Sequence, residues 1–255
     1  MKIATWNVNS LKVRLQHVID WLTLHQPDVL CLQETKLEDK NFPAKEFLEA
    51  SYNVAFTGQK TYNGVALLSR EPMQDIKMGI PNYADEQKRV IYGTYKNVRI
   101  ICGYFPNGQS VGSEKYQYKL QWLENLRGWV KTEIEQYPRL ALLGDYNIAP
   151  EDRDVHDPKA WEGEVLVSEP EREAFRHLIS LGLKDSFRLF EQPEKMFSWW
   201  DYRMLAFRRN AGLRIDHILL TSPLAEKCIS CTIDKAPRKL ERPSDHAPVV
   251  VELDL

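Results

Sequence analysis

Short apolar runs that are typical of β-strands recur along the whole chain, and helical stretches separate some of them. Strand-like runs include "KIATWNV", "VLCLQ", "GVALLS", "VRIICGYF", "LALLG" and "VVVEL". Apolar residues at helical spacing predict a long helix over residues 114–135. Ser168 and Glu171 form a capping box for another helix, which Gly182 can end. Strands in adjacent pairs, with others separated by helices, predict two packed sheets flanked by helices, and not one doubly wound parallel sheet.

Length and composition predict one soluble domain over residues 1–255. The chain is long enough to bury a large core, and its 43% hydrophobic and 27% charged residues are typical of a globular protein. Asn7 and Asn9 interrupt the N-terminal apolar stretch, and no apolar run of about 18 residues occurs. We therefore expect a cytoplasmic protein without a membrane span. Cys228 and Cys231 form a single CxxC without a second pair, which favours reduced thiols over a zinc site.

Polar side chains stand where the predicted strands end. These residues are Asn7, Asn9, Gln33, Glu34, Tyr104, Asp145, Asn147, Asp216, Asp245 and His246. Each has a plain alternative in isolation: Asp145 and Asn147 could form an Asx turn, and Asp216 could pair with an arginine. These alternatives do not explain why six strand ends all carry an acid, amide, hydroxyl or imidazole. Strand ends and loops held by a rigid sheet are the usual place for a catalytic site.

This set of groups suits the hydrolysis of a phosphodiester. The phosphate is anionic, so the site needs a divalent cation, and Mg²⁺ prefers carboxylate and amide oxygens such as those of Glu34 and Asn7. Asp145 could deprotonate an attacking water, which Asn147 could steady. His246 could stay protonated beside an acid and stabilise the developing charge. The sequence contains no G-x-S-x-G or P-loop pattern, so we expect no covalent nucleophile.

Basic residues are concentrated in two stretches, although the net charge is −2 and the pI about 6.3. Between Tyr202 and Ile215 there are four arginines and no acid, and residues 235–242 carry four basic side chains against Glu241. Such clusters are usually solvated faces. They are also what a nucleic-acid backbone needs, because neutralising phosphates releases counterions.

The motifs "WNVNSL", "PDVLCLQETK", "YNGVALLSR", "GYFPNG", "LLGDYNIAP", "FSWWDYR", "GLRIDHILL" and "PSDHAPV" span essentially the whole chain. In this order and spacing, the chain resembles the exonuclease III-type AP endonucleases of the endonuclease/exonuclease/phosphatase superfamily. The resemblance implies a four-layer α/β sandwich of two mixed sheets with the active site at one edge. It also implies an enzyme that cuts DNA 5′ to abasic sites and removes nucleotides or blocking groups from 3′ ends of duplex DNA. We expect a monomer.

The resemblance also implies a metal site. Glu34 is the principal ligand, with Asn7 and Asp245 close enough to share the ion. The expected ion is Mg²⁺, with Mn²⁺ as an alternative.

Five further residues take catalytic roles by the same resemblance. Asp145 activates the water with help from Asn147, Tyr104 contacts the scissile phosphate, and His246 pairs with Asp216 and contacts a phosphate oxygen. One departure is Tyr146, which stands where the family usually has Phe or Met. Because both functional side chains beside it are kept, we expect little effect.

The resemblance assigns DNA contacts to a third set of side chains. An apolar pocket accepts a flipped-out baseless sugar, and a loop inserts an apolar side chain into the minor groove while arginines meet phosphates. Asn107 touches the groove from the other side. The whole set is Asn9, Asn107, Trp199, Arg203, Met204, Leu213 and Ile215.

Three other functions are alternatives to an AP endonuclease with 3′-end activity. A bulky residue in the loop from Arg153 to Val167, such as Leu166 or Val167, could exclude the abasic sugar and leave mainly a 3′–5′ exonuclease. A superfamily phosphatase acting on a phospholipid or inositol substrate would not need "FSWWDYR" or the "GLRID" pocket. A DNA-binding module without catalysis is disfavoured because every catalytic side chain is present.

Overall fold

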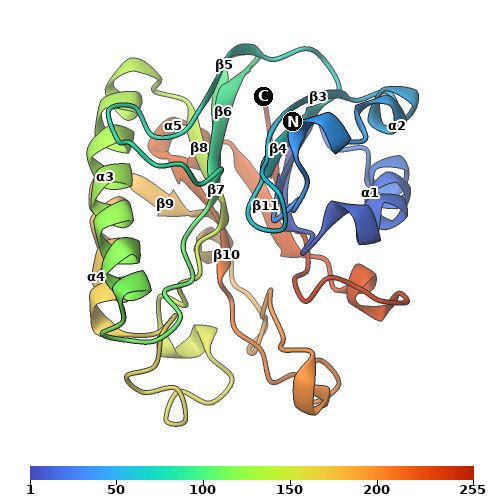
Figure 1. Cartoon of the computed structure of the whole chain (residues 1–255). Helices are drawn as coiled ribbons and strands as arrows, with labels where there is room; N and C mark the ends of the chain where they lie inside the picture. The colour runs from blue at the N-terminus through green and yellow to red at the C-terminus, as the bar shows by residue number, and fades with distance from the viewer.

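Two six-stranded mixed sheets form the centre of the computed structural model, which describes residues 1–255 (Figure 1). The first sheet has the order β11 (Cys228–Ile233), β12 (Val249–Leu253), β1 (Lys2–Asn7), β2 (Val29–Gln33), β4 (Val65–Ser69), β3 (Asn53–Thr57). The second has the order β5 (Gln74–Met78), β6 (Val90–Tyr95), β7 (Val98–Tyr104), β8 (Leu140–Asp145), β10 (Asp216–Thr221), β9 (Leu183–Asp185). In each sheet one central pair, β1 with β2 and β7 with β8, is parallel, and the other pairs are antiparallel.

Helices cover both outer faces of the sheet pair, as Figure 1 shows. α1 (Leu11–His25) and α2 (Ala44–Glu49) lie on the first sheet, α3 (Glu114–Gln136) and α4 (Glu169–Ser180) lie on the second, and α5 (Ser222–Ala225) is a short turn. A cluster of 26 buried residues fills the space between the sheets, and separate clusters of 18 and 13 residues lie under the two helical layers. The predicted four-layer α/β sandwich is confirmed.

Local sequence signals set several element boundaries. The capping box of α4 is present, because Ser168 and Glu171 each bond the other's backbone, and Gly182 follows the helix with φ +94°. The long helix begins one residue after Ser113, whose Oγ accepts a hydrogen bond from the Tyr116 amide. No helix of the structure is both long enough and apolar enough to cross a bilayer. All four cysteines are free thiols, three of them buried.

The topology brings the polar strand ends to one edge of the sandwich. Asn7 is in register with Gln33 at the ends of β1 and β2, and Tyr104 is in register with Asp145 at the ends of β7 and β8. β10 is antiparallel to β8 and begins with Asp216 directly opposite Asp145. In Figure 1 this edge is the lower one, and both chain termini lie at the upper end.

Candidate active site

Asn7 connects the two sheets at this edge. Its Nδ2 donates to Glu34 Oε1 at 3.0 Å and to Asp145 Oδ2 at 2.9 Å, while its Oδ1 accepts from the Asn9 amide at 2.9 Å. Lys36 Nζ lies 2.8 Å from the second oxygen of Glu34. The amide of Asn7 therefore holds one carboxylate from each sheet side by side, and its assigned role as a metal neighbour remains a prediction.

Ligand atoms of Glu34, Asp145 and His246 all lie within 4.8 Å of one another. Carboxylate oxygens are among the donors that hard divalent cations prefer, so the carboxylates of Glu34 and Asp145 fit such an ion, and His246 lies beside them. Asp245 is not in this group. Its two oxygens accept from Asn9 Nδ2 at 2.9 Å and from Trp199 Nε1 at 3.0 Å, so its metal-binding role also remains a prediction.

Asp145 is buried at the end of β8, with 1% of its surface exposed. Burial raises the pKa of Asp145 to about 7; the imidazolium of His246 opposes this rise, and the carboxylate of Asp216 adds to it. The carboxyl therefore titrates near neutral pH, which is where a general base works best. The backbone amide of Asn147 donates to Asp145 Oδ1 at 2.9 Å and fixes the carboxyl's orientation.

His246 lies between two carboxylates. Its Nδ1 is 2.9 Å and 3.1 Å from the two oxygens of Asp216, and its Nε2 is 3.7 Å from Asp145 Oδ2. Burial alone would lower the pKa of His246, but the carboxylates of Asp216 and Asp145 outweigh it and raise the pKa to about 10. The hydrogen bond between Asp216 and His246 that the sequence led us to expect is present, and the ring is an imidazolium at neutral pH.

Asn147 adopts a left-handed conformation with φ +51°. Its side-chain Nδ2 donates to the carbonyl of Phe105 at 2.9 Å, and its Oδ1 accepts from Asn107 Nδ2 at 3.2 Å. Asn tolerates this region of φ better than most residues because its short polar side chain bonds locally. The two predicted amides, from the loops after β7 and β8, are thus in contact.

Tyr104 stands beside Glu34 and Asp145. Burial raises the pKa of its phenol well above the usual value, and both carboxylates add to the rise, so the group stays a neutral hydroxyl. The guanidinium carbon of Arg89 lies 4.9 Å from the centre of its ring.

Several side chains that support the site were not predicted from the sequence. Lys36 pairs with Glu34, Arg89 covers Tyr104, and Ser198 Oγ donates to Asp216 Oδ2 at 2.7 Å. Only Lys36 has a local sequence signal, because it follows Glu34 by two residues in "QETK" and can pair with it. Arg89 and Ser198 reach the site only through the tertiary fold.

The side chains assigned to the sugar pocket lie in a closed apolar cluster. Leu213 is 0% and Ile215 1% exposed, and they pack with Leu166, Val167 and half-buried Trp199. Leu166 has φ +77°, and its carbonyl accepts from the Ala149 amide at 2.8 Å. Residues of the 149–167 loop thus share this cluster with Leu213 and Ile215, and the role of the cluster as a sugar pocket remains a prediction.

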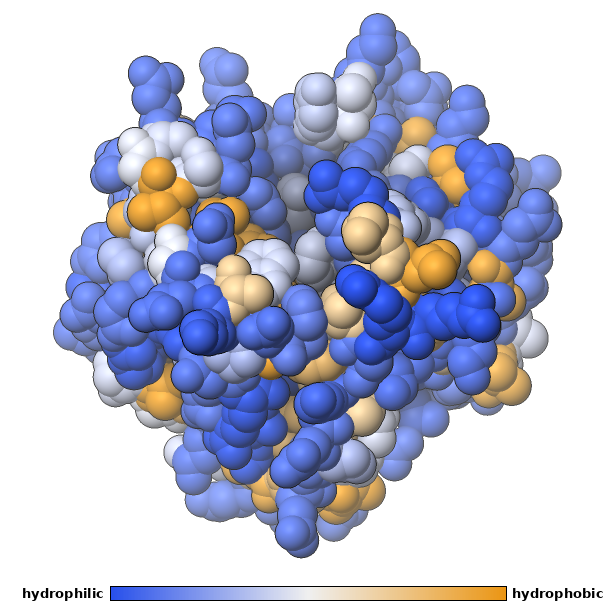
Figure 2. Space-filling view, turned by 90° about the horizontal axis from the view of Figure 1, so that it is seen from below, coloured by the Kyte–Doolittle hydropathy of each residue, from blue (hydrophilic) through white to orange (hydrophobic).

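The segment assigned to the minor groove projects from the same edge. Arg203 pairs with Asp201 at 2.6 Å, and Met204 is 77% exposed on a turn with φ +57°. Trp200, the neighbour of Trp199 in sequence, is a buried core residue. Figure 2 shows this face from below, with small groups of apolar side chains lying among hydrophilic ones.

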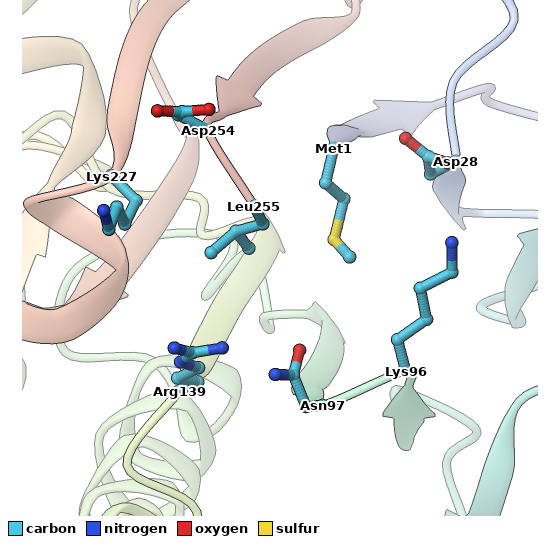
Figure 3. Close-up of a pocket in the computed structure, with 8 residues that line it drawn as sticks. All are labelled: Met1, Asp28, Lys96, Asn97, Arg139, Lys227, Asp254 and Leu255. Carbon is cyan, nitrogen blue, oxygen red and sulfur yellow. The ribbon is translucent and has the colours of Figure 1, made fainter.

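A pocket at the opposite end of the molecule contains none of these side chains (Figure 3). Its lining residues are Met1, Asp28, Lys96, Asn97, Arg139, Lys227, Asp254 and Leu255. Lys96 is already paired with Glu71 at 2.9 Å. The candidate site is therefore the lower edge of the sandwich and not this pocket.

A two-sheet sandwich with two adjoining carboxylates, an imidazolium held by an acid, and amides at the strand ends of one edge is an arrangement suited to a phosphoesterase. The sequence matches the endonuclease/exonuclease/phosphatase family over residues 4–246, and the chain belongs to this family of metal-dependent enzymes. It is a nuclease, a hydrolase of phosphodiester bonds.

Named relatives resemble the chain along its full length. It is 37% identical to exodeoxyribonuclease III of Haemophilus influenzae, with 99% of each chain covered. Among solved structures, it is 45% identical to the 3′–5′ exonuclease of Neisseria meningitidis with a TM-score of 0.98, and 41% identical to an AP endonuclease of Archaeoglobus fulgidus with a TM-score of 0.97. Both structural comparisons cover 100% of each chain.

Proposed function

We propose that this nuclease, acting as a monomer, cleaves DNA 5′ to abasic sites and removes nucleotides or blocking groups from 3′ ends of duplex DNA. One observation carries the proposal: the buried carboxyl of Asp145, whose pKa burial raises to about 7, has its Oδ2 3.7 Å from Nε2 of the His246 ring, and Asp216 holds the other nitrogen of that ring. A base and a cation thus lie close enough together to act on a single phosphate group. The similarity to exodeoxyribonuclease III and to an AP endonuclease supports DNA as the substrate.

The chemistry follows from these positions. Asp145 takes a proton from a water whose oxygen attacks the phosphorus, and the bond from phosphorus to the 3′ oxygen breaks. His246 and the Tyr104 hydroxyl donate to phosphate oxygens, and Asn147 orients the water or a non-bridging oxygen. Mg²⁺, or Mn²⁺ in its place, would be held by Glu34 with Asn7 and Asp245 nearby, and it would stabilise charge on the phosphate and the leaving oxygen.

The face around this centre suits a DNA duplex. Arg203 and Met204 are exposed on a projecting turn, so we propose that Met204 enters the minor groove while Arg203 exchanges Asp201 for a phosphate. Asn9 and Asn107 flank the centre on its two sides through their bonds to Asp245 and Asn147. Trp199 would contact the sugar or the end nucleotide.

A second candidate is an enzyme that mainly trims 3′ ends and incises abasic sites weakly. The closed cluster of Leu166 with Leu213 and Ile215 favours it, because a flipped-out sugar would have to displace Leu166. The 45% identical neisserial structures are those of a 3′–5′ exonuclease and of a 3′ phosphatase bound to a product DNA hairpin. That similarity is compatible with either balance of the two activities.

One experiment tests both candidates. End-labelled duplexes are incubated with the protein and Mg²⁺: one duplex contains an internal abasic-site analogue, and the other is intact with a recessed 3′ end. We expect a product that ends at the abasic position from the first and a ladder of shortened strands from the second, both abolished by EDTA. A ladder without incision would leave the second candidate, and no cleavage of either duplex would overturn the proposed function.

The role of Asp145 has a matched control. Asp145→Asn should lower the rate of both reactions by about 10²-fold or more, because general base catalysis contributes about 10²–10⁴-fold. Asp75→Asn, on the exposed edge strand β5 with φ +50°, changes the same chemical group at a position that Asn tolerates and should leave both rates unchanged. A fully active Asp145→Asn protein would contradict the mechanism.

A further inference from the structure

A fully buried lysine reaches the back of the active site from α3. Lys119 and Glu171 form an ion pair in which both side chains are 0% exposed. Lys119 Nζ also donates to the carbonyl of Asn147 at 2.6 Å and to the carbonyl of Asn107 at 3.1 Å. These two asparagines come from the loops that follow β8 and β7, and their side chains contact each other at the site. One ammonium group therefore holds both loops.

The carboxylate of the same pair holds a third loop. Glu171 Oε1 accepts from the Leu166 amide at 3.0 Å, and Glu171 Oε2 accepts from the Ser168 amide at 3.2 Å. Leu166 is one of the six buried residues of the apolar cluster against which Trp199 packs. The ion pair thus connects Asn107 and Asn147 to the loop that carries Leu166.

Stability alone does not account for a buried ion pair here. Removing two charges from water costs much of what their attraction returns, and apolar side chains of similar volume are often equally or more stabilising. Burial lowers the pKa of Lys119, and Glu171 opposes this shift. What an apolar pair could not replace is the set of hydrogen bonds to the three loops, since the carbonyls of Asn107 and Asn147 would lose their shared donor.

We propose that the ion pair of Lys119 and Glu171 is a positioning element, which sets the geometry of Asn107 and Asn147 against the phosphate and of Leu166 beside the sugar. This inference rests on the proposed function. Lys119 does not touch the substrate, because its three donors are all used by Asn107, Asn147 and Glu171. It acts through Asn147, which has a left-handed backbone: the Asn147 carbonyl accepts from Lys119 Nζ, and the Asn147 side-chain Nδ2 donates to the Phe105 carbonyl.

The first test separates positioning from binding. Lys119→Met keeps an unbranched side chain that is one atom shorter, and removes the three donors. We expect kcat for cleavage of the recessed duplex to fall by about 10- to 100-fold, because a displacement of about 1 Å can cost about 10²-fold in rate. KM for DNA should change by less than about threefold, because the exposed DNA-contacting side chains are untouched. Glu171→Gln should move kcat in the same direction, and it serves as the second variant if Lys119→Met does not fold.

A second buried ion pair provides the control. Arg99 Nε lies 2.8 Å from Glu133 Oε2, and Arg99 also donates to the Asp75 carbonyl and to Thr94, far from the site edge. Arg99→Met should lower the unfolding midpoint as Lys119→Met does, while kcat stays at the wild-type value. If Arg99→Met lowers kcat equally, the loss at Lys119 reflects general destabilisation and the inference is wrong.

A double variant makes the distinction sharper. Lys119→Met with Glu171→Met removes both charges, and we expect it to regain thermal stability relative to the single variants without regaining kcat. Wild-type kcat in a folded Lys119→Met or double variant would overturn the positioning role. Failure of the proposed function is distinguishable from this outcome, because then the wild-type protein itself would cleave neither duplex.

Discussion

At the scale of single residues, opposite environments set the charges of the two central groups. Burial raises the pKa of Asp145 to about 7, whereas neighbouring carboxylates outweigh the effect of burial on His246 and raise its pKa to about 10. Asp145 is the base only when deprotonated, and His246 is a cation only when protonated. The nuclease should therefore be most active between these two values, with its rate falling as the pH drops below the first or rises above the second.

The partnership with Asp216 can be tested through the alkaline side of this profile. In Asp216→Asn, His246 loses the carboxylate that raises its pKa, so the imidazolium deprotonates at a lower pH. We expect the alkaline fall in kcat to move from near pH 10 toward neutral pH, and kcat at neutral pH to drop. The measurement is kcat against pH for both proteins with Mg²⁺ saturating. An unchanged alkaline limb would show that His246 does not depend on Asp216.

Leu166 gives a second residue-scale prediction. Its φ of +77° suits glycine, so Leu166→Gly relieves backbone strain while it removes the side chain from the cluster beside Trp199. We expect incision of the abasic duplex to rise relative to trimming of the recessed duplex, measured as the ratio of the two kcat/KM values. Asn82→Gly, at an exposed position with φ +60°, should leave the ratio unchanged. A constant ratio in Leu166→Gly would mean that the cluster does not limit entry of the sugar.

How far single residues could be predicted depended on whether their function has a local signal. The pairing of Asp216 with His246 follows from the sequence, because both lie at strand ends and the family resemblance links them. Ser198, by contrast, reaches Asp216 from a loop 18 positions earlier, and nothing in "FSWW" marks its hydroxyl as a hydrogen-bond donor. The two adjacent tryptophans also look alike in the sequence, yet Trp199 lies at the site and Trp200 lies in the core.

At the scale of elements, most strands and helix α3 follow from their apolar patterns, and α4 follows from its capping box. β5 was not predicted, because "QDIKM" is exposed throughout and shows no buried face. β9 was not predicted either, because three residues are too few for a pattern to show. Both lie at the edges of the second sheet, where pairing with one neighbour defines the strand more than its own sequence does.

The start of α3 carries a testable energetic contribution. Ser113 Oγ accepts from the Tyr116 amide at 3.1 Å and satisfies one of the free donors of the first turn. Ser113→Ala should lower the free energy of unfolding by about 1 kcal/mol, the usual value for such a cap. Urea unfolding should show a lower midpoint with an unchanged slope. Ser110→Ala, in the exposed turn just before the helix, is the control and should have a smaller effect.

At the scale of the whole molecule, the sequence alone predicted two packed sheets but not their strand order. Pairing of β1 with β12, at opposite ends of the chain, is a long-range contact that no local pattern encodes. The resemblance to a known family supplied the four layers and the edge on which the site lies. Physical reasoning from the residues supplied the chemistry, because a carboxylate, an amide and an imidazole at neighbouring strand ends suit a phosphodiester wherever the strands pair.

The distribution of charge over the whole molecule gives a last prediction. The net charge is −2, so long-range attraction to DNA must come from basic side chains on the site edge, such as Arg203 on its exposed turn. Affinity for a non-cleavable duplex in Ca²⁺ should therefore fall steeply as salt rises, since each neutralised phosphate releases a counterion. Arg203→Ala should reduce the slope of log Kd against log salt by about 1. Lys77→Ala, on the edge strand β5, should leave that slope unchanged. If the slope is the same in both variants, the projecting turn does not bind the DNA backbone. DNA must then approach the site across a different part of the surface.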